Sequence, residues 1–217
     1  VRSIAVLRGP QNTLYGRNAM GGVMDIKTIS PLDYEGTRLM VEGGNGNTWR
    51  GRASTYRRIN ANLGMSVAAQ GSRSDGYYVN EYKNADCDWS RTAGLNLRME
   101  GRTRDGAEDG IHWNVFSSLD WVNQGGFPYR LLERGTERLL PISYNDRCGY
   151  HRVAWRLGAS FEGSWNRLRY NATTSYQLVD DDMQMDQDFI PLSMFTLRQA
   201  QRDHTLNQDF TLRPVDK

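Results

Sequence analysis

The feature that most constrains the fold is a two-residue alternation of apolar and polar side chains, which is clearest in three long segments. From Arg152 to Glu162, apolar residues recur at every second position, and those between them are mainly charged, polar or small. The same pattern runs from Ile111 to Val122 and from Arg167 to Val179. Because successive side chains of a strand point to opposite faces, these segments predict β-strands with one apolar face each.

Further segments share this strand character, so we expect an all-β chain with about eight antiparallel strands after residue 31. The other predicted strands run from Arg38 to Glu42, Trp49 to Arg57, Asn62 to Gln70, Thr92 to Glu100 and Asp203 to Arg213. Most of them reach the roughly 9–11 residues that a tilted membrane strand needs, whereas a globular strand usually has roughly 5–6. Their length favours a membrane β-barrel.

The connections between the predicted strands alternate between short and long. Short connections cover 58–61, 101–110 and 163–166, and long ones cover 71–91, 123–151 and 180–202. This sorting is typical of an outer-membrane barrel, whose long loops lie outside the cell. The tight turn at 43–47 is an exception, since it would face outward and yet is short.

Charge and hydropathy argue against a nucleic-acid partner and against a transmembrane helix. The net charge is +2, from 27 basic and 25 acidic residues, which argues against a dedicated nucleic-acid binder. No apolar run approaches the roughly 18 residues of a transmembrane helix, so any membrane contact must be made by strands. The chain begins at Val1 without a recognisable signal peptide and ends at Lys217, and we interpret both ends as cuts.

No catalytic or metal-binding constellation is expected. The histidines His112, His151 and His204 are dispersed along the chain. The acids of Asp180 to Asp188 are interpreted as part of a solvated outward loop, because they lack the oxygen spacing of a calcium loop. We therefore expect a protein that is not an enzyme and has no cofactor. A soluble β-sandwich binding module and a β-rich hydrolase remain as alternatives from other classes.

The first thirty residues differ from the rest. A strand from Ser3 to Pro10 and another from Val23 to Thr28 flank a glycine-rich break, which predicts a compact strand–turn–strand unit. Residues 6–26 read VLRGPQNTLYGRNAMGGVMDI and closely resemble the end of the plug domain in TonB-dependent outer-membrane receptors. The family pattern there is V-L-R-G-P-x-S-T-L-Y-G-x-x-A-x-G-G-V-x-x-I, from which Asn12 and Asp25 depart slightly. The motif residues are Arg8, Gly9, Pro10, Tyr15, Gly16, Gly21 and Gly22.

This resemblance implies a plug end at residues 1–31, followed by the first strands of a transmembrane barrel at 32–217. It implies that Arg8 faces carboxylates on the inner barrel wall and locks the plug in place. It also implies energy-coupled import of a scarce nutrient across the bacterial outer membrane, with TonB and its inner-membrane complex as partners. A ferric siderophore is the expected cargo, and haem, cobalamin or an oligosaccharide are alternatives.

The long loops carry the remaining candidate residues. Phe127, Tyr129 and Arg130 offer aromatic and cationic surface suited to an anionic, aromatic cargo. Cys87 and Cys148 fall in neighbouring outward loops, where a disulfide is a hypothesis and two free thiols are the alternative.

Overall fold

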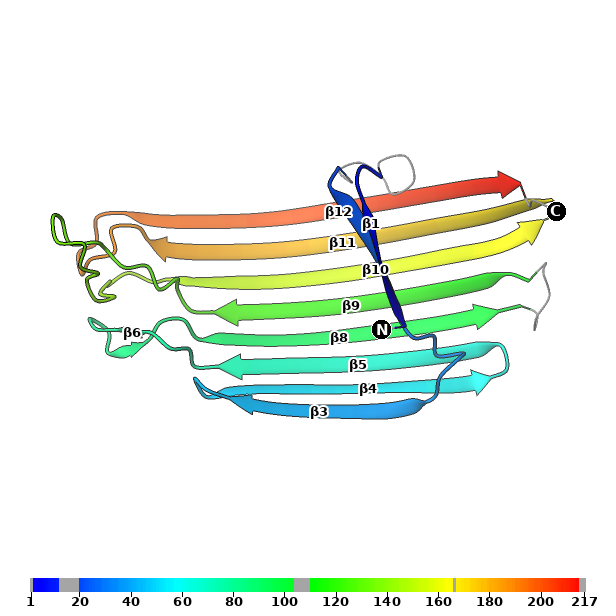
Figure 1. Cartoon of the computed structure of the whole chain (residues 1–217), viewed down its shortest axis with the longest axis horizontal. Coiled ribbons are helices and arrows are strands. Elements are labelled where there is room, and N and C mark those ends of the chain that lie inside the picture. Colours follow the sequence, from blue (N-terminus) through cyan, green and yellow to red (C-terminus); the bar gives the residue numbers. More distant parts are fainter. Residues whose placement is uncertain (1, 12–19, 104–109, 166, 215–217) are drawn as a thin grey trace.

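The computed structural model describes residues 2–11, 20–103, 110–165 and 167–214, and all regular elements within these ranges are strands. The largest sheet has eight strands in the order β3-β4-β5-β8-β9-β10-β11-β12, all antiparallel to their neighbours (Figure 1). The all-β prediction is therefore confirmed. Within the described ranges, no helix is long and apolar enough to cross a membrane.

The strands of the large sheet lengthen along the chain, and each overlaps one predicted strand. They are β3 (Gly36–Gly44), β4 (Thr48–Asn60), β5 (Leu63–Ser74), β8 (Ser90–Arg102), β9 (His112–Gln124), β10 (Gly149–Trp165), β11 (Leu168–Asp186) and β12 (Thr196–Pro214). Two small sheets complete the fold: the β1–β2 hairpin (Ser3–Arg8, Gly22–Lys27) and the β6–β7 pair (Val79–Asn80, Ala85–Asp86).

One predicted loop is in fact strand. The first part of the segment expected to be an outward loop, up to Asp186, continues β11, and only 187–195 connect it to β12. The side chain of Asp182 pairs with Arg198 at 2.9 Å, and that of Asp180 pairs with Arg202. Cross-strand ion pairs thus allow this highly charged segment to form a strand. The composition of the segment alone does not reveal these pairs, and it therefore predicted a loop.

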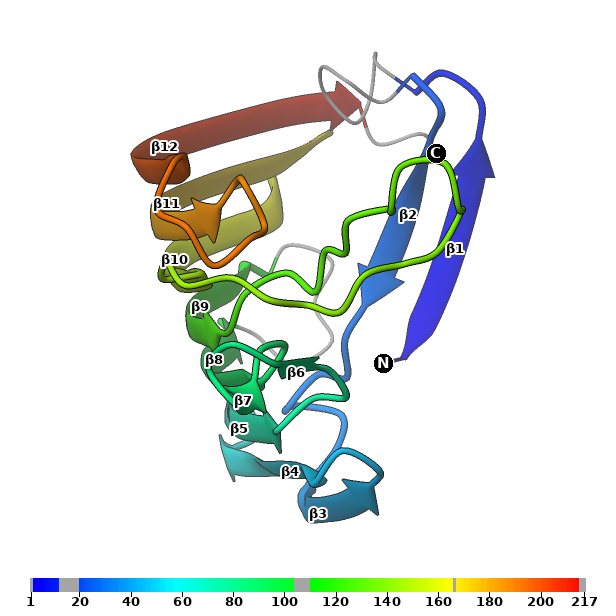
Figure 2. The same ribbon diagram turned by 90° about the vertical axis from the view of Figure 1, so that its left-hand side faces the viewer.

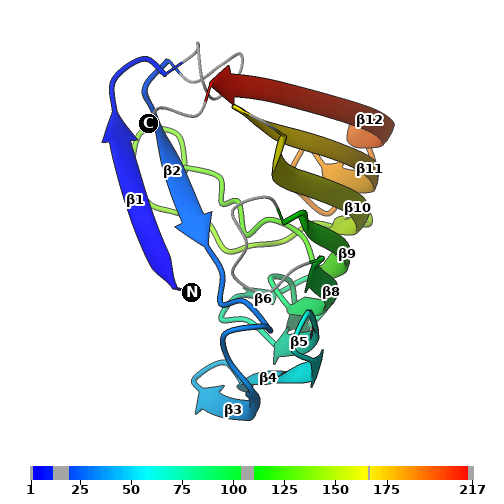
Figure 3. The ribbon, with the colours of Figure 1, turned by 90° about the vertical axis from the view of Figure 1, so that its right-hand side faces the viewer.

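The two faces of the large sheet differ sharply. Figures 2 and 3 show the β1–β2 hairpin in front of the concave face. The convex face carries the predicted apolar rows, and many of these side chains are exposed, as with Leu39 at 77%, Leu206 at 71% and Phe210 at 67%. In the described part of the chain no second sheet packs over this face. An uncovered apolar face of this size favours a barrel wall in lipid over a soluble sandwich.

The outward connections lie together at one end of the sheet (Figure 1). Residues 75–89, 125–148 and 187–195 are the longer ones, and 45–47 form the short exception that the sequence predicts. Gly46 and Asn47 have φ of 67° and 47°, the left-handed conformation that tight hairpin turns require. The short connection at 61–62 lies at the opposite end of the sheet.

The free edges of the sheet lead to a prediction about the isolated chain. Among the described strands, β3 and β12 each pair on one side only, and 19-residue β12 is exposed along nearly its whole length. Long unpaired edges beside an apolar face promote edge-to-edge association. We expect the isolated 217-residue chain to aggregate in water, as measured by light scattering and sedimentation velocity. A cooperatively melting, soluble monomer would contradict the barrel interpretation.

Candidate functional site

The turn end of the β1–β2 hairpin carries the first plug-motif residues. Arg8 closes β1 opposite Gly22, and Gly9 follows with φ of 89°. Gly22 has φ of 138°, and a Cβ there would lie 2.5 Å from the Leu7 carbonyl oxygen. The positive φ therefore favours glycine at both positions, and at Gly22 the close approach of the Leu7 carbonyl also excludes a side chain.

The described contacts give fewer reasons for the identity of the other motif residues. Pro10 follows the left-handed Gly9, and a Cβ at Gly21 would meet nothing within 4 Å. Tyr15 and Gly16 lie outside the described residues. Arg8 is exposed and forms no ion pair with another described residue, so its role as a plug lock stays a prediction.

Residues 28–35, here called the linker, connect the hairpin to the barrel wall and dock into a notch in it. Pro31 and Leu32 are buried, and a Cβ at Gly64 on β5 would lie only 2.8 Å from the Pro31 carbonyl carbon. The Arg58 guanidinium donates a hydrogen bond to the Leu32 carbonyl. Gly64 thus gives the linker room to lie against the strand, and Arg58 holds it there. The predicted domain boundary at residue 31 falls within this linker.

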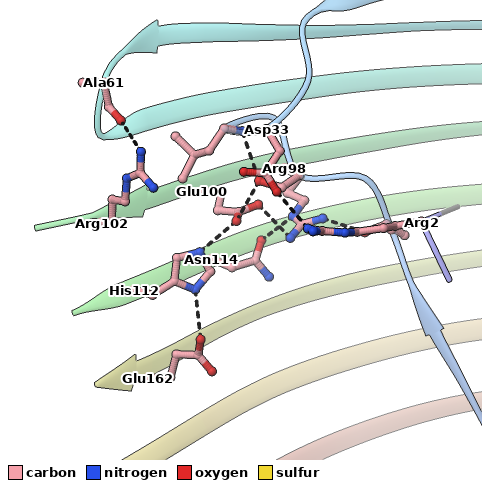
Figure 4. Close-up of polar contacts among 12 residues, drawn as sticks. Arg2, Asp33, Ala61, Arg98, Glu100, Arg102, His112, Asn114 and Glu162 are labelled. Carbon is pink, nitrogen blue, oxygen red and sulfur yellow. Dashed lines mark hydrogen bonds and ion pairs between the residues drawn. The ribbon is translucent and has the colours of Figure 1, made fainter. Parts of the chain in front are cut away.

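A buried carboxylate fixes the linker beside the notch (Figure 4). Glu100 is only 4% exposed and accepts a hydrogen bond of 2.9 Å from the Ser30 hydroxyl. Its other oxygen pairs with Arg98 at 2.8 Å. Arg98 also donates to the Thr28 hydroxyl at 2.6 Å and to the Asn114 side-chain oxygen at 2.8 Å. Two linker hydroxyls are therefore held by one ion pair on the barrel wall.

His112 extends this network across the wall. Its Nε2 lies 2.8 Å from Glu100, and its Nδ1 lies 3.5 Å from Glu162 on β10 (Figure 4). The sequence placed His112 and Asn114 on one polar face, but it gave no sign that Glu100 and Arg98 would meet them. Only the antiparallel register, which pairs Glu100 with Asn114, brings the group together.

At the outward end, the loop at 75–89 and the loop at 125–148 pack into one cap. Asn80 is 1% exposed and donates to the Tyr144 carbonyl at 2.9 Å, while its own oxygen accepts from the Tyr82 amide. The Lys83 ammonium lies 4.8 Å from the centre of the Tyr144 ring and donates to the Asp146 carbonyl. A buried amide that is hydrogen-bonded through both its nitrogen and its oxygen makes this contact specific.

The connection at 187–195 joins the same cap. Asp186 is fully buried and accepts hydrogen bonds from the amides of Asp146 at 3.1 Å and Phe189 at 2.9 Å. The Asn145 side chain donates to the Ser193 hydroxyl at 2.7 Å. Three outward connections are thus held together by buried or shared polar groups.

The two cysteines lie in the cap as free thiols. Cys87 forms a buried cluster with Ile142 and Tyr144, and Cys148 packs against this cluster. The Cys87 thiol donates to the Tyr78 carbonyl at 3.3 Å, and the Cys148 sulfur accepts from the Asp186 amide at 3.1 Å. Burial raises the pKa of each thiol and also raises the pKa of Tyr144. The disulfide hypothesis stays a prediction.

The raised thiol pKa values predict how the cap responds to alkali. A thiol whose pKa is higher in the folded state stabilises that state fully below its unfolded pKa of about 8.5, and this contribution is lost as the pH rises above it. We expect Cys87 and Cys148 of the reduced full-length receptor to resist alkylation near neutral pH and to react steeply above pH ~9. Mass spectrometry after timed iodoacetamide treatment measures this. Rapid labelling at neutral pH, equal to that in urea, would contradict it.

The cargo-contact candidates form part of an aromatic cluster. Phe127 and Tyr129 have ring centroids 5.9 Å apart, and Tyr129 meets Phe189 edge-on at 5.4 Å. Tyr129 is 51% exposed, whereas the Arg130 side chain donates to the Leu140 carbonyl at 2.9 Å. Nothing in the sequence groups Phe189 with these residues, because it lies in another loop, about sixty residues after Tyr129.

The concave face holds a hollow beside the linker. It has a volume of about 430 Å³ and includes Thr28, Tyr56, Arg98, Asn114 and Phe116 in its lining. Among the described residues, no group of three His, Cys, Asp or Glu side chains is placed to hold a metal ion.

Comparisons with known proteins add local sequence matches and a fold match. No family model matches the chain. The vitamin B12 transporter BtuB of Vibrio vulnificus is 36% identical over 87 residues, which cover 37% of this chain and 13% of BtuB. The pesticin receptor of Yersinia enterocolitica is 48% identical over 44 residues, covering 20% of this chain and 6% of that receptor.

The structural match extends over nearly the whole chain. The crystal structure of the ferric yersiniabactin uptake receptor FyuA from Yersinia pestis superposes with a TM-score of 0.74 and 19% identity. The match covers 99% of this chain and 33% of FyuA, so the chain spans about a third of that receptor. The two local matches and the shared fold bear out the resemblance of the plug-end motif to TonB-dependent outer-membrane receptors.

Proposed function

We propose that this chain forms the plug end and the first part of the barrel wall in an importer of ferric siderophores. The observation that carries the proposal is the arrangement of the motif-bearing hairpin on the concave side of a wall whose convex face is apolar (Figure 2). In such an importer the wall contacts lipid outside and the plug inside. The domain boundary near residue 31 belongs to this proposal, with 1–31 as plug end and 32–217 as barrel.

The transport cycle is energised from the inner membrane and involves no catalysis. TonB and its inner-membrane complex pull on a short N-terminal box of the receptor, the plug rearranges, and the bound nutrient passes. In this scheme Arg8 anchors the plug to carboxylates of the wall. Arg8 is exposed in this chain, and a guanidinium that the closed barrel buries would be costly without such partners, so the proposal requires Arg8 to be paired there.

The outward cap supports a cargo with aromatic and anionic groups. Phe127, Tyr129 and Phe189 form a ring cluster at its surface, and Arg130 lies next to it in the chain. Aromatic faces and guanidinium groups suit the chelating rings and negative charge of many iron chelates. BtuB is named for vitamin B12 and FyuA for ferric yersiniabactin, so cobalamin stands as the alternative cargo beside haem and oligosaccharides.

Uptake measurements with the full-length receptor test this function. The receptor is expressed in a bacterial strain that lacks its own iron-chelate receptors, and radiolabelled iron is supplied as a panel of siderophores. We expect uptake of at least one ferric siderophore that is lost when TonB is deleted. Uptake of labelled cobalamin or haem alone would refute the cargo assignment. Uptake that persists without TonB would refute the mechanism.

The proposed contact residues are tested in the same receptor. Tyr129→Ala is expected to weaken cargo binding about tenfold, the effect of an interface aromatic that carries binding energy. The matched control is Tyr82→Ala, because Tyr82 is also an exposed loop tyrosine, at 58%, but is not part of the ring cluster. Equal losses for both variants in equilibrium binding would contradict the assignment.

The disulfide hypothesis needs a separate measurement. Formation of a bond between the Cys87 and Cys148 sulfurs releases two protons and two electrons, which a disulfide-exchange protein of the cell envelope would accept. Intact mass of the native receptor, taken with and without reductant, distinguishes the bond from two thiols. Two alkylatable thiols in the freshly isolated receptor would end the hypothesis.

A further inference from the structure

The hollow beside the linker has the size and the aromatic lining of a small-molecule site. Its volume of about 430 Å³ lies within the roughly 300–1,000 Å³ of such sites. Tyr56 and Phe116 contribute aromatic rings to the lining, and Ser66 and Ala68 are small residues within it. Phe116 packs over Gly158, where a Cβ would lie 2.5 Å from the phenyl ring. The hollow can therefore admit a planar group beside two aromatic side chains.

Several polar groups of the lining have no side-chain hydrogen bond to another described residue. They are the hydroxyl groups of Tyr56 and Ser66 and the amide of Asn96. The Asn114 side chain uses only its oxygen, which accepts from Arg98, so its amide nitrogen is also available. Hydroxyl and amide groups together serve a ligand that both donates and accepts hydrogen bonds.

The charge of the hollow is already balanced. Arg98 is the one charged residue among the described lining residues, and it pairs with the buried Glu100 at 2.8 Å. Its remaining donors reach Asn114 and the Thr28 hydroxyl. An inorganic anion would find no free cation here and would leave both rings uncovered. The lining therefore favours an uncharged aromatic ring that carries hydroxyl groups, such as a phenol or a catechol.

The hollow lies away from the cap and is closed on one side by the linker. On β8, which starts at the cap, the lining includes Asn96 to Arg98, and on β9, which runs back, it includes Asn114. Thr28 and Ile29 of the linker form part of the same lining. A ring held at the cap reaches the hollow only by moving along the wall. A linker that leaves its notch removes one side of the hollow.

We infer that this hollow is an inner binding site, which receives a hydroxylated aromatic ring of the cargo after the cargo has left the cap. The inference rests on the proposed function, because it takes the cargo to move along this wall. The docked linker completes the site, and its release opens the site on one side. The ring is therefore held before the plug end rearranges and is freed when it does.

Direct binding is tested with a fluorinated catechol as probe and the full-length receptor in detergent, by fluorine NMR line broadening. All samples carry Tyr129→Ala, so that the ring cluster of the cap does not contribute. We expect Ala68→Phe, which fills the hollow, to weaken binding about tenfold. Ala69→Phe is the matched control, because residue 69 of β5 points to the opposite, convex face, and it should bind the probe as its parent does.

A second variant removes a polar group without adding bulk. Asn96→Ala should weaken binding of the probe about fivefold, the contribution of one hydrogen bond, and it keeps the test decisive if Ala68→Phe fails to fold. Absence of probe binding to the parent receptor, unchanged binding in Asn96→Ala, or an equal loss in Ala69→Phe would overturn the inference.

Transport distinguishes the inner site from the cap. With Tyr129 intact, Ala68→Phe should leave the equilibrium affinity for the ferric siderophore unchanged and lower its initial uptake rate severalfold, whereas Tyr129→Ala lowers the affinity. Uptake by Ala68→Phe at the rate of Ala69→Phe would refute the inner site and leave the import function standing. A receptor that imports no ferric siderophore would refute the import function, and the catechol measurement would still test the hollow by itself.

Discussion

Replacing Glu100 by alanine is expected to lower the free energy of unfolding of the full-length receptor by about 3 kcal/mol, the cost of breaking a buried ion pair. The substitution removes the partner of Arg98, whose side chain is 24% exposed, and leaves the Ser30 hydroxyl without its acceptor. It also removes the carboxylate nearest to His112. Urea unfolding in detergent micelles, followed by tryptophan fluorescence, measures the change.

Glu162→Ala provides the matched control for this prediction. Glu162 contacts the same histidine, but its side chain is 59% exposed and the distance is 3.5 Å. An exposed pair of this kind contributes less than about 1 kcal/mol. A loss for Glu100→Ala that is no larger than that for Glu162→Ala would show that the linker network contributes little to stability.

The second large effect is expected from Gly64→Val. A Cβ at Gly64 would lie 2.8 Å from both the carbonyl carbon and the carbonyl oxygen of Pro31, and 3.1 Å from the Leu32 nitrogen. These are backbone atoms, which cannot rotate away, so the linker must leave its notch. Overpacking of this kind costs about 2 kcal/mol or more.

Hydrogen exchange locates the damage caused by Gly64→Val. The Leu32 amide donates to the Ser30 hydroxyl at 3.1 Å, and we expect its exchange to accelerate markedly in the variant. Gly51→Val is the control, because a Cβ at Gly51, on the neighbouring strand, would meet nothing within 4 Å. Unchanged exchange at Leu32, or equal destabilisation by Gly51→Val, would refute the notch as the constraint at this position.

These two predictions concern the same junction, in which the linker packs against the large sheet. Glu100 acts through charge and hydrogen bonds, whereas Gly64 acts through the absence of a side chain. The double variant should lose less stability than the sum of the single losses, because either change alone already releases the linker. At this junction the linker fixes the β1–β2 hairpin to the large sheet.

The sequence by itself determined the β class, the eight long strands and the division of each strand into an apolar and a polar face. Alternation with a period of two is a local property, so a segment such as Arg152 to Glu162 reveals its two faces without its partners. The plug motif is likewise local, and the left-handed φ of Gly9 and Gly22 agrees with the use of glycine there. The end of β11 is not a local property, because the ion pairs that accompany its extension join residues about twenty positions apart.

Only the tertiary structure decided which polar residues meet. Glu100 and Ser30 are seventy residues apart, and Asn80 and the Tyr144 carbonyl are sixty-four apart. Each strand offers many polar side chains on its inner face, and nothing local distinguishes Glu100 from the rest. The choice is made by antiparallel register and by the path of the linker over Gly64, and both are properties of the assembled wall.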